Sequence, residues 1–184
     1  MNVENQARRG FTIWMTGLPA SGKSTLATIL KERLENEYGK FVEVLDGDDI
    51  RKGLSRDLGL SREDREEHAR RVSYLAKILS RNGVISIVAL ISPYRSSRAS
   101  ARELIGPDKF VEVYVKASLS TCENRDPKGL YAKARRGEIM NMTGIQDPYE
   151  EPLNPDIEVN TEKAAPDESA RDVIVALIDM KLLK

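Results

Sequence analysis

The sequence has a single cysteine, carries no net charge and contains no long apolar run. One cysteine, Cys122, excludes an intramolecular disulfide and a thiolate metal site, and it favours a reducing compartment. Because 29 Lys and Arg residues balance 29 Asp and Glu residues, we expect no nucleic-acid or anionic-membrane partner on electrostatic grounds. The longest apolar stretch, residues 84–91, is far too short for a membrane span, and residues 1–10 carry no signal peptide. We therefore expect a soluble, cytoplasmic protein.

The size and composition of the chain suit one folded domain. It has 184 residues, of which 40% are apolar and 32% charged, so it can build a core and is not disordered. Short β-rich runs alternate with helical periods, which predicts βαβ units and a parallel sheet with right-handed crossovers. The predicted strands are residues 11–16, 41–45, 84–91, 110–115 and 156–159, and the predicted helices are residues 24–38, 61–82, 97–105 and one that opens at Pro166.

One long segment interrupts this alternation. Residues 125–155 are rich in Gly and Pro, with one short helical patch at residues 130–136 and no predicted strand. The first part, residues 125–138, has five Lys or Arg against two acidic residues, a local charge of +3. Thirty residues without a strand inside an α/β domain favour a functional lid. A solvated surface loop is the alternative.

A phosphate-binding loop is predicted between the first strand and the first helix. Residues 17–24 place four residues between two glycines and then Lys and Ser, in the strand-to-helix context that this motif requires. Inward-pointing N–H groups and the helix dipole would bind phosphate, with Lys23 at the β- and γ-phosphates and Ser24 holding Mg²⁺. A structural glycine turn is the alternative. We predict nucleoside triphosphate binding and a P-loop NTPase-type α/β fold, a three-layer α/β/α single domain over residues 1–184 with a mainly parallel five-stranded sheet and a lid.

An acidic turn follows the second predicted strand. Asp46-Gly47-Asp48 stands at the carboxyl end of that strand, where open α/β sheets bind ligands. Two carboxylates in an extended turn can share work, one orienting Mg²⁺ or its water and one accepting a proton from an acceptor hydroxyl. Asp and Gly are also ordinary turn residues. Since no Asn-Lys-x-Asp segment of a GTPase occurs, a small kinase is favoured over a molecular switch.

Further polar residues cluster near the same predicted edge. Ser92 ends the most apolar strand and could bind phosphate or act as a nucleophile, although Ser-Pro could simply end the strand. Arg95 follows Ser92 and could pair with an anionic group. Further arginines, Arg51, Arg65, Arg70 and Arg71, come just after the acidic turn and on the next predicted helix, where a solvated helix face explains part of them. His68, the one histidine, has no partner histidine or cysteine for a metal site, and an exposed polar residue is the alternative to a functional role.

Taken together, these segments resemble the adenylylsulfate kinase family over nearly the whole chain. The matching stretches are residues 17–25, 44–48, 64–65, 70–71, 91–95, 125–131, 143–145 and 147–150. The phosphate loop is shared by many families, whereas the Asp-Pro-Lys-Gly-Leu-Tyr and Thr-Gly-Ile blocks are far more specific. The resemblance implies transfer of the γ-phosphoryl group of ATP, with Mg²⁺, to the 3′-hydroxyl of adenosine 5′-phosphosulfate. A homodimer is expected from the resemblance alone.

The resemblance also implies roles for individual residues. The expected catalytic residues are Lys23, Asp46, Asp48 and Ser92, and Ser92 matches a serine described for the family as a phosphoserine intermediate. The expected ATP-binding residues are Gly17, Leu18, Pro19, Ala20, Ser21, Gly22, Lys23, Ser24, Thr25 and Arg125. The expected acceptor-binding residues are Asp48, Arg51, Leu60, Arg65, His68, Ile91, Ser92, Lys128, Leu130, Met142, Thr143, Gly144 and Ile145.

Three residues depart from the family pattern on the acceptor side. Leu60 and Met142 stand where the family usually has phenylalanines that sandwich the acceptor adenine, and His68 stands where an asparagine is common. Base stacking on an aromatic ring is worth roughly 1–3 kcal/mol. Two alternatives therefore stay open: a kinase of the same family that acts on another nucleotide 5′-anhydride or phosphoramidate, and a non-catalytic nucleotide-binding module.

Overall fold

A five-stranded sheet forms the centre of the protein, and each pair of neighbouring strands in it is parallel. The computed structural model describes residues 10–184, so the expectation of a start without a signal peptide concerns residues that lie mainly outside the described part. The strand order is β2-β3-β1-β4-β5. The strands are β1 Thr12–Thr16, β2 Val42–Asp46, β3 Ile85–Ala89, β4 Phe110–Lys116 and β5 Ile157–Asn160.

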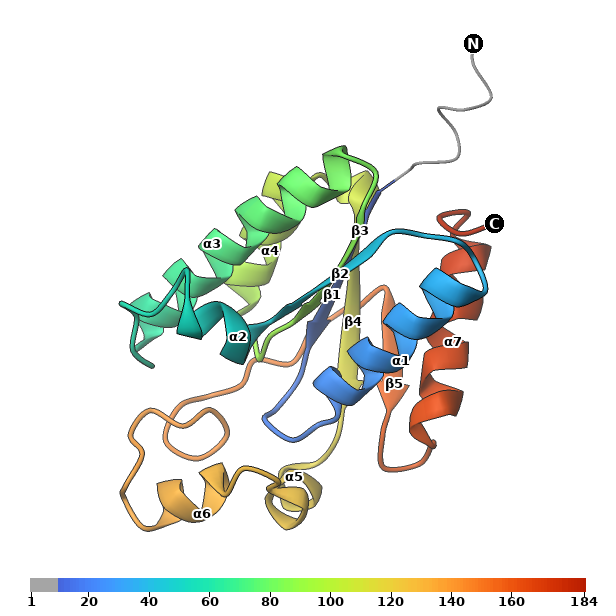
Figure 1. The fold of residues 1–184 in the computed structure, drawn as a ribbon. Coiled ribbons are helices and arrows are strands. Elements are labelled where there is room, and N and C mark those ends of the chain that lie inside the picture. Colours follow the sequence, from blue (N-terminus) through green and yellow to red (C-terminus); the bar gives the residue numbers. More distant parts are fainter. Residues whose placement is uncertain (1–9) are drawn as a thin grey trace.

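Helices cover both faces of this sheet and make three layers (Figure 1). Helices α1 and α7 pack together on one face, while α3 and α4 pack together on the other. The helices are α1 Lys23–Asn36, α2 Gly47–Lys52, α3 Arg62–Arg81, α4 Arg95–Ile105, the 3₁₀ turn η2 Pro107–Lys109, α5 Leu119–Arg125, α6 Leu130–Arg135 and α7 Pro166–Asp179. The predicted three-layer α/β/α fold with a parallel five-stranded sheet is confirmed.

The two faces of the sheet bury separate apolar cores. Beneath α1 and α7 the core includes Ile13, Leu30 and Leu177, each fully buried. Beneath α3 and α4 it includes Trp14, whose ring stacks on Phe110 with 5.6 Å between ring centroids. All residues of β1 and β3 are buried, as expected for interior strands of a sheet covered on both faces. This packing fixes the carboxyl ends of β1, β2 and β3 side by side.

Local sequence signals explain where α3 and α7 begin. The Ser61 hydroxyl accepts a hydrogen bond from the Asp64 N–H at 3.1 Å, which is the N-cap predicted for α3. Pro166 occupies the first turn of α7, as predicted. Helix α4 begins at Arg95, two residues before the predicted start.

Two short helices, α2 and α5, were not predicted, and α2 corrects the interpretation of the acidic turn. Residues 46–48 do not form an extended turn, because Asp46 is the N-cap of α2 and accepts a hydrogen bond from the Asp48 N–H at 2.9 Å. Asp and Asn at an N-cap satisfy a helix N–H that has no partner within the helix. The turn residues therefore also start a helix of six residues, too short to show an apolar period.

The segment predicted to be a lid, residues 125–155, contains α6 and no strand, apart from one isolated bridge between Thr143 and Asp147. It has a small apolar cluster of its own, in which Tyr131, Ala134 and Met142 pack on Cys122. In Figure 1 this segment lies beyond the carboxyl ends of the strands, opposite the N-terminus of β1. It therefore faces the edge of the sheet at which ligands are expected.

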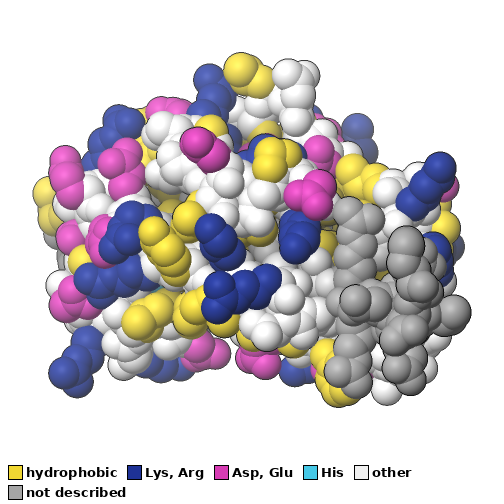
Figure 2. Space-filling view, turned by 90° about the horizontal axis from the view of Figure 1, so that it is seen from above, with side chains coloured by type: hydrophobic (Ala, Val, Ile, Leu, Met, Phe, Trp, Pro, Cys, Tyr) yellow, Lys and Arg dark blue, Asp and Glu magenta, His cyan; other side chains and the backbone are white. Residues whose placement is uncertain are grey.

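The surface shown in Figure 2 mixes charges of both signs. Lys and Arg side chains are interspersed with Asp and Glu over this face, and no single-sign field covers it. Among residues 10–184, no helix is both long enough and apolar enough to cross a membrane.

Candidate active site

The phosphate loop connects β1 to α1, and two glycines are required for its shape. A Cβ atom on Gly17 would lie 2.4 Å from the Val115 carbonyl oxygen of β4, so no side chain fits there. Gly22 has φ of 103° and sits at the N-cap of α1, a left-handed conformation that favours glycine. The loop thus presents the N-terminus of a fourteen-residue helix toward the space above the sheet.

Lys23 is folded back onto this loop. Its ammonium group donates hydrogen bonds to the carbonyl oxygens of Gly17 at 2.8 Å and Leu18 at 2.7 Å. Burial lowers the pKa of Lys23 to about 8, because desolvation disfavours its charge. A phosphate group beside this ammonium would stabilise the charged form.

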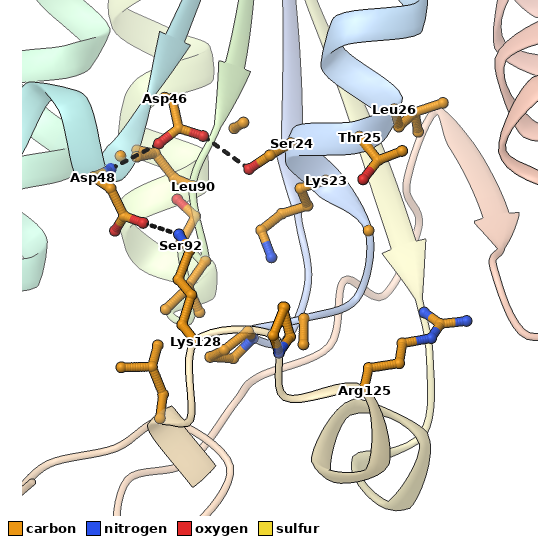
Figure 3. A pocket seen from close by; sticks show the side chains of 18 of the residues that line it. Lys23, Ser24, Thr25, Leu26, Asp46, Asp48, Leu90, Ser92, Arg125 and Lys128 are labelled. Atoms are coloured by element: carbon orange, nitrogen blue, oxygen red, sulfur yellow. Dashed lines mark hydrogen bonds and ion pairs between the residues drawn. The ribbon is translucent and has the colours of Figure 1, made fainter. Parts of the chain in front are cut away.

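The acidic pair lies next to the loop serine (Figure 3). The Ser24 hydroxyl donates a hydrogen bond to Asp46 Oδ2 at 2.8 Å, while Oδ1 of the same carboxylate caps α2. Asp48 forms an ion pair with Lys128 of the lid segment. In Figure 3 the acidic pair lies on one side of the cleft and Arg125 on the other, with Lys23 and Ser24 between them.

Ser92 is held in a left-handed conformation, with φ of 46°. Trp14 Nε1 donates a hydrogen bond to the Ser92 hydroxyl at 3.1 Å, and the buried Arg98 donates to its carbonyl oxygen at 2.6 Å. Thr16 donates to the same carbonyl oxygen at 3.2 Å. A non-glycine residue at positive φ is strained, and such strain is found at sites where the backbone must approach a ligand.

The predicted acceptor side contains two arginines that are oriented by backbone carbonyl groups. Arg51 donates to the Gly59 carbonyl oxygen at 2.8 Å, and Arg65 donates to those of Leu60 at 3.0 Å and Asn141 at 2.8 Å. Each guanidinium has five N–H donors, so both can still bind an anion. Burial lowers the pKa of both groups, but an arginine in a protein stays charged.

His68 on α3 is buried, with 5% of its surface exposed, so the alternative of an exposed polar residue is wrong. Neither ring nitrogen has a hydrogen-bond partner among the described residues. Helix α3 turns this side chain inward, on the same face as Arg65, Ala69 and Val72. His68 lies four residues before Val72 and seven before Leu75, and this helical spacing could have predicted that His68 is on the buried face of α3.

One cleft of about 640 Å³ brings most of these residues together. It lies at the carboxyl ends of the strands, between the phosphate loop, the acidic turn and the lid segment. The predicted residues that line it are Pro19, Ala20, Gly22, Lys23, Ser24, Thr25, Asp46, Asp48, Arg51, Arg65, His68, Ile91, Ser92, Arg125, Lys128 and Leu130.

Some predicted residues do not line this cleft. Three belong to the phosphate loop and five to the predicted acceptor side: Gly17, Leu18, Ser21, Leu60, Met142, Thr143, Gly144 and Ile145. Met142 is buried in the apolar cluster of the lid, and Gly144 and Ile145 line a separate shallow hollow with Leu18. For Met142 or Ile145 to touch the acceptor, the lid segment would have to move. Their role stays a prediction.

Sequence reasoning missed Thr161. Its hydroxyl donates to the Ser21 carbonyl oxygen at 2.8 Å and accepts a hydrogen bond from Arg125 at 3.0 Å, while its carbonyl accepts another from Arg125 at 2.6 Å. Thr161 lines the cleft directly after β5. The rule that ligands bind at the carboxyl ends of parallel strands could have found it.

The donor atoms around Ser24 fit a magnesium ion. Mg²⁺ prefers oxygen ligands, and it is usually held by one or two protein groups together with substrate phosphates. In P-loop enzymes these groups are the loop Ser or Thr and a nearby Asp. Ser24 and Asp46 are already joined at 2.8 Å, so they present a hydroxyl and a carboxylate at the place where the phosphates would bind.

Fold and site together define a P-loop nucleotide kinase rather than a switch GTPase. At the edge of the parallel sheet, one cleft combines a complete phosphate loop with a second half that is lined by Arg51 and Arg65.

Comparison with known proteins identifies the family. The family described as adenylylsulphate kinase matches residues 9–160. An adenylyl-sulfate kinase of Halothermothrix orenii is 53% identical over 91% of this chain and 89% of its own length. A probable adenylyl-sulfate kinase of Pyrococcus abyssi is 56% identical over 90% of this chain and 93% of its own.

A solved structure is similar along most of both chains. The Mycobacterium tuberculosis APS kinase CysC, in complex with AMPPNP and APS, is 46% identical and superposes with a TM-score of 0.88. The superposition covers 92% of this chain and 98% of the CysC chain. The chain belongs to the adenylylsulfate kinase family, as its sequence motifs indicated.

Proposed function

We propose that this protein transfers the γ-phosphoryl group of ATP to the 3′-hydroxyl of adenosine 5′-phosphosulfate. The products are 3′-phosphoadenosine 5′-phosphosulfate and ADP. The observation that carries this proposal is the single cleft in which the phosphate loop faces Asp48, Arg51 and Arg65. Membership of the adenylylsulfate kinase family supports the identity of the acceptor.

The phosphate loop binds the donor. Its N–H groups and the N-terminus of α1 hold the phosphates, and Lys23 exchanges its two loop carbonyls for phosphate oxygens. Ser24 and Asp46 would hold Mg²⁺, which neutralises charge on the β- and γ-phosphates when bound. Arg125, fixed by Thr161, closes the opposite side of the cleft and binds the donor nucleotide.

Asp48 accepts the proton of the attacking hydroxyl. In the free protein its carboxylate is paired with Lys128 of the lid segment. The negative phosphates of the donor attract Lys128, which leaves Asp48 free to accept that proton as the new P–O bond forms. Direct in-line transfer needs positioning and charge neutralisation, and it requires no covalent enzyme intermediate.

Arg51, Arg65 and Ser92 orient the acceptor. The two arginines bind the phosphosulfate through N–H groups that are not used by backbone carbonyls. Ser92 already accepts a hydrogen bond from Trp14, so its hydroxyl proton can point toward the acceptor. We assign Ser92 to positioning of the acceptor.

An ADP-release assay with several acceptors tests the proposal. Adenosine 5′-phosphosulfate should give rapid ADP release with wild type, and Lys23→Ala should lower the rate at least about a hundredfold, since one preorganised charge contact is lost. Lys31→Ala, an exposed lysine on the same helix, is the matched control and should leave the rate unchanged.

Other results would redirect the assignment. A higher kcat/KM for another nucleotide 5′-anhydride or for a phosphoramidate than for adenosine 5′-phosphosulfate would show that the natural acceptor is a different one. Leu60 and Met142 leave this alternative open. ATP binding without ADP release for any acceptor would make it a non-catalytic nucleotide-binding module. The homodimer expected from the family resemblance stays a prediction, and sedimentation of the purified protein would test it.

A further inference from the structure

The buried imidazole of His68 lines the cleft, although neither of its nitrogens has a hydrogen-bond partner among the described residues. Buried polar groups in native proteins nearly always have a hydrogen-bond partner. Two ring nitrogens without one therefore point to a partner that arrives with the ligand. His68 lies on the same cleft wall as Arg51 and Arg65, the groups that the proposed function gives to the acceptor.

The position of the ring directs it to the acceptor half of the cleft. A Cβ atom built on Gly47 would lie 3.7 Å from His68 Nε2, so the ring faces the backbone of the acidic turn. An anion bound by Arg51 and Arg65 would lie beside this ring.

The charges around His68 oppose a positive imidazole in the free protein. Arg51 on α2 and Arg65 and Arg71 on α3 repel it, and the one opposing group, Asp48, is itself paired with Lys128. Burial and these three arginines lower the pKa of His68 to about 4. The ring is therefore neutral near pH 7.

We propose that His68 is an anion-gated ligand of the acceptor: it is neutral in the free protein, and takes up one proton from solvent when the phosphosulfate binds. The two negative charges of that group offset the surrounding arginines, and the imidazolium donates a hydrogen bond to an anionic oxygen. This proposal rests on the proposed function, because it needs a dianionic acceptor at Arg51 and Arg65.

Proton uptake makes acceptor binding depend on pH in a defined direction. Binding that takes up a proton becomes tighter as the pH falls, by at most tenfold per pH unit, between the pKa of the complex and that of the free protein. Phosphosulfate has no group of its own that titrates in this range. The asparagine common at this position in the family can donate a hydrogen bond but cannot take up a proton.

The sole histidine allows a direct measurement without any substitution. The chain contains one histidine, so a tag-free, ¹⁵N-labelled protein gives a single imidazole signal in NMR spectra. The shifts of Nδ1 and Nε2 separate the neutral tautomers from imidazolium. With saturating adenosine 5′-phosphosulfate, the midpoint of this titration should rise from about 4 by more than about two pH units, because only then does His68 gain charge between pH 8 and pH 6. An unchanged midpoint overturns the proposal.

Calorimetry of the wild type and of His68→Asn provides the second readout. Adenosine 5′-phosphosulfate should bind wild type at least about threefold tighter at pH 6 than at pH 8, with a binding enthalpy that depends on the ionisation enthalpy of the buffer. His68→Asn should reduce both dependences, and the part that remains in both proteins includes the titration of Lys23, whose pKa of about 8 lies in the same range. Equal pH profiles for the two proteins overturn the proposal.

This test separates the inference from the function on which it rests. If wild type binds adenosine 5′-phosphosulfate with a flat pH profile and no proton uptake, only the role of His68 is wrong. If wild type does not bind it at any pH, the proposed function itself is wrong. If His68→Asn fails to fold, His68→Gln can replace it, because the glutamine amide lies nearer the position of Nε2. The NMR titration uses wild type and needs no variant.

Discussion

Asp46 and Asp48 stand two residues apart but are engaged in different ways. Asp46 uses one oxygen to cap α2 and the other to accept from Ser24, so its position is fixed from both sides. Asp48 has one ion pair with a lysine of the lid segment and is otherwise exposed to the cleft. The proposed function uses this difference, since Asp48 would exchange Lys128 for the acceptor hydroxyl while Asp46 keeps both of its partners.

Replacing Asp48 by Asn should lower kcat far more than it raises the KM for ATP. The substitution removes a proton acceptor and leaves the phosphate loop intact, and an interaction made mainly in the transition state is lost from kcat. We expect a fall of about a hundredfold or more, measured by steady-state ADP release.

Asp49→Asn is the matched control for this substitution. Asp49 is the next residue along α2, but its carboxylate pairs with Lys52 at 2.6 Å on the exposed surface. Such pairs contribute little to stability, so this variant should behave as wild type. An Asp48→Asn enzyme with normal kcat and a raised KM for ATP would show that Asp48 serves donor binding.

At the scale of elements, polar contacts hold the lid segment to the rest of the protein at both of its ends, through Arg125 with Thr161 at its start and through Glu150 with Arg98 near its end. Lys128 reaches Asp48, and Tyr131 donates a hydrogen bond to the Pro19 carbonyl oxygen at 3.0 Å. Its apolar cluster includes Ala117 and Cys122 from outside the segment. The segment is therefore a small packed unit that the phosphate loop and the acidic turn both contact.

We expect hydrogen exchange of residues 125–155 to slow when ADP and adenosine 5′-phosphosulfate are both bound. Both nucleotides attract the basic residues of this segment, and closure would exclude the water that competes with the acceptor hydroxyl. Peptides from residues 72–81 of α3, none of which lines the cleft, serve as the internal control. Equally fast exchange of residues 125–155 in the free and ternary forms would remove the basis for a lid.

Leu60 and Met142 should respond differently to phenylalanine. Leu60 is 37% exposed, so Leu60→Phe has room and should tighten an adenine acceptor by roughly 1 kcal/mol if the residue contacts its base. Met142 is 4% exposed within the lid cluster, where a larger ring overpacks and destabilises by about 1–3 kcal/mol.

Acceptor KM and urea unfolding of the two single variants measure these effects. The KM for ATP should stay unchanged in both, because the donor binds elsewhere. Tighter acceptor binding by Met142→Phe without loss of stability would show that this side chain leaves its cluster when the acceptor binds. No change with Leu60→Phe would remove Leu60 from the acceptor site.

At the scale of the whole molecule, the parallel topology explains why much of the site could be predicted. Once five strands and the phosphate loop are located, Asp46, Asp48 and Ser92 must meet at one edge, because parallel strands end there. The pattern of apolar periods is sufficient for this step.

Other features depend on contacts that a linear pattern does not contain. The lack of a hydrogen-bond partner for the His68 ring follows from which residues surround it in the fold, and the start of α2 follows from one capping hydrogen bond. The position of Thr161 directly after β5 could have been predicted, but its pairing with Arg125, 36 residues earlier in the chain, could not. Spacing in the sequence carries no record of these pairings.

Buried, neutral His68 also makes the stability of the whole fold depend on pH. Its pKa is about 4 in the folded protein, below the 6.5 of an exposed histidine, so between these values the unfolded chain binds a proton that the native protein does not. The free energy of unfolding therefore falls as the pH drops from 6.5 to 4, with His68 contributing up to about 3 kcal/mol of that fall.

His68→Asn should remove this contribution and leave the acid sensitivity that carboxylates cause in both proteins. Urea unfolding at pH 4.5, 5.5 and 6.5 should show a shallower fall in the free energy of unfolding for the variant than for wild type. Because only the difference between the two slopes is attributed to His68, any fixed cost of the substitution cancels. Equal slopes of the free energy of unfolding against pH would mean that His68 is protonated in the native protein over this range. The assignment of a neutral, unpaired imidazole to the free protein would then be wrong.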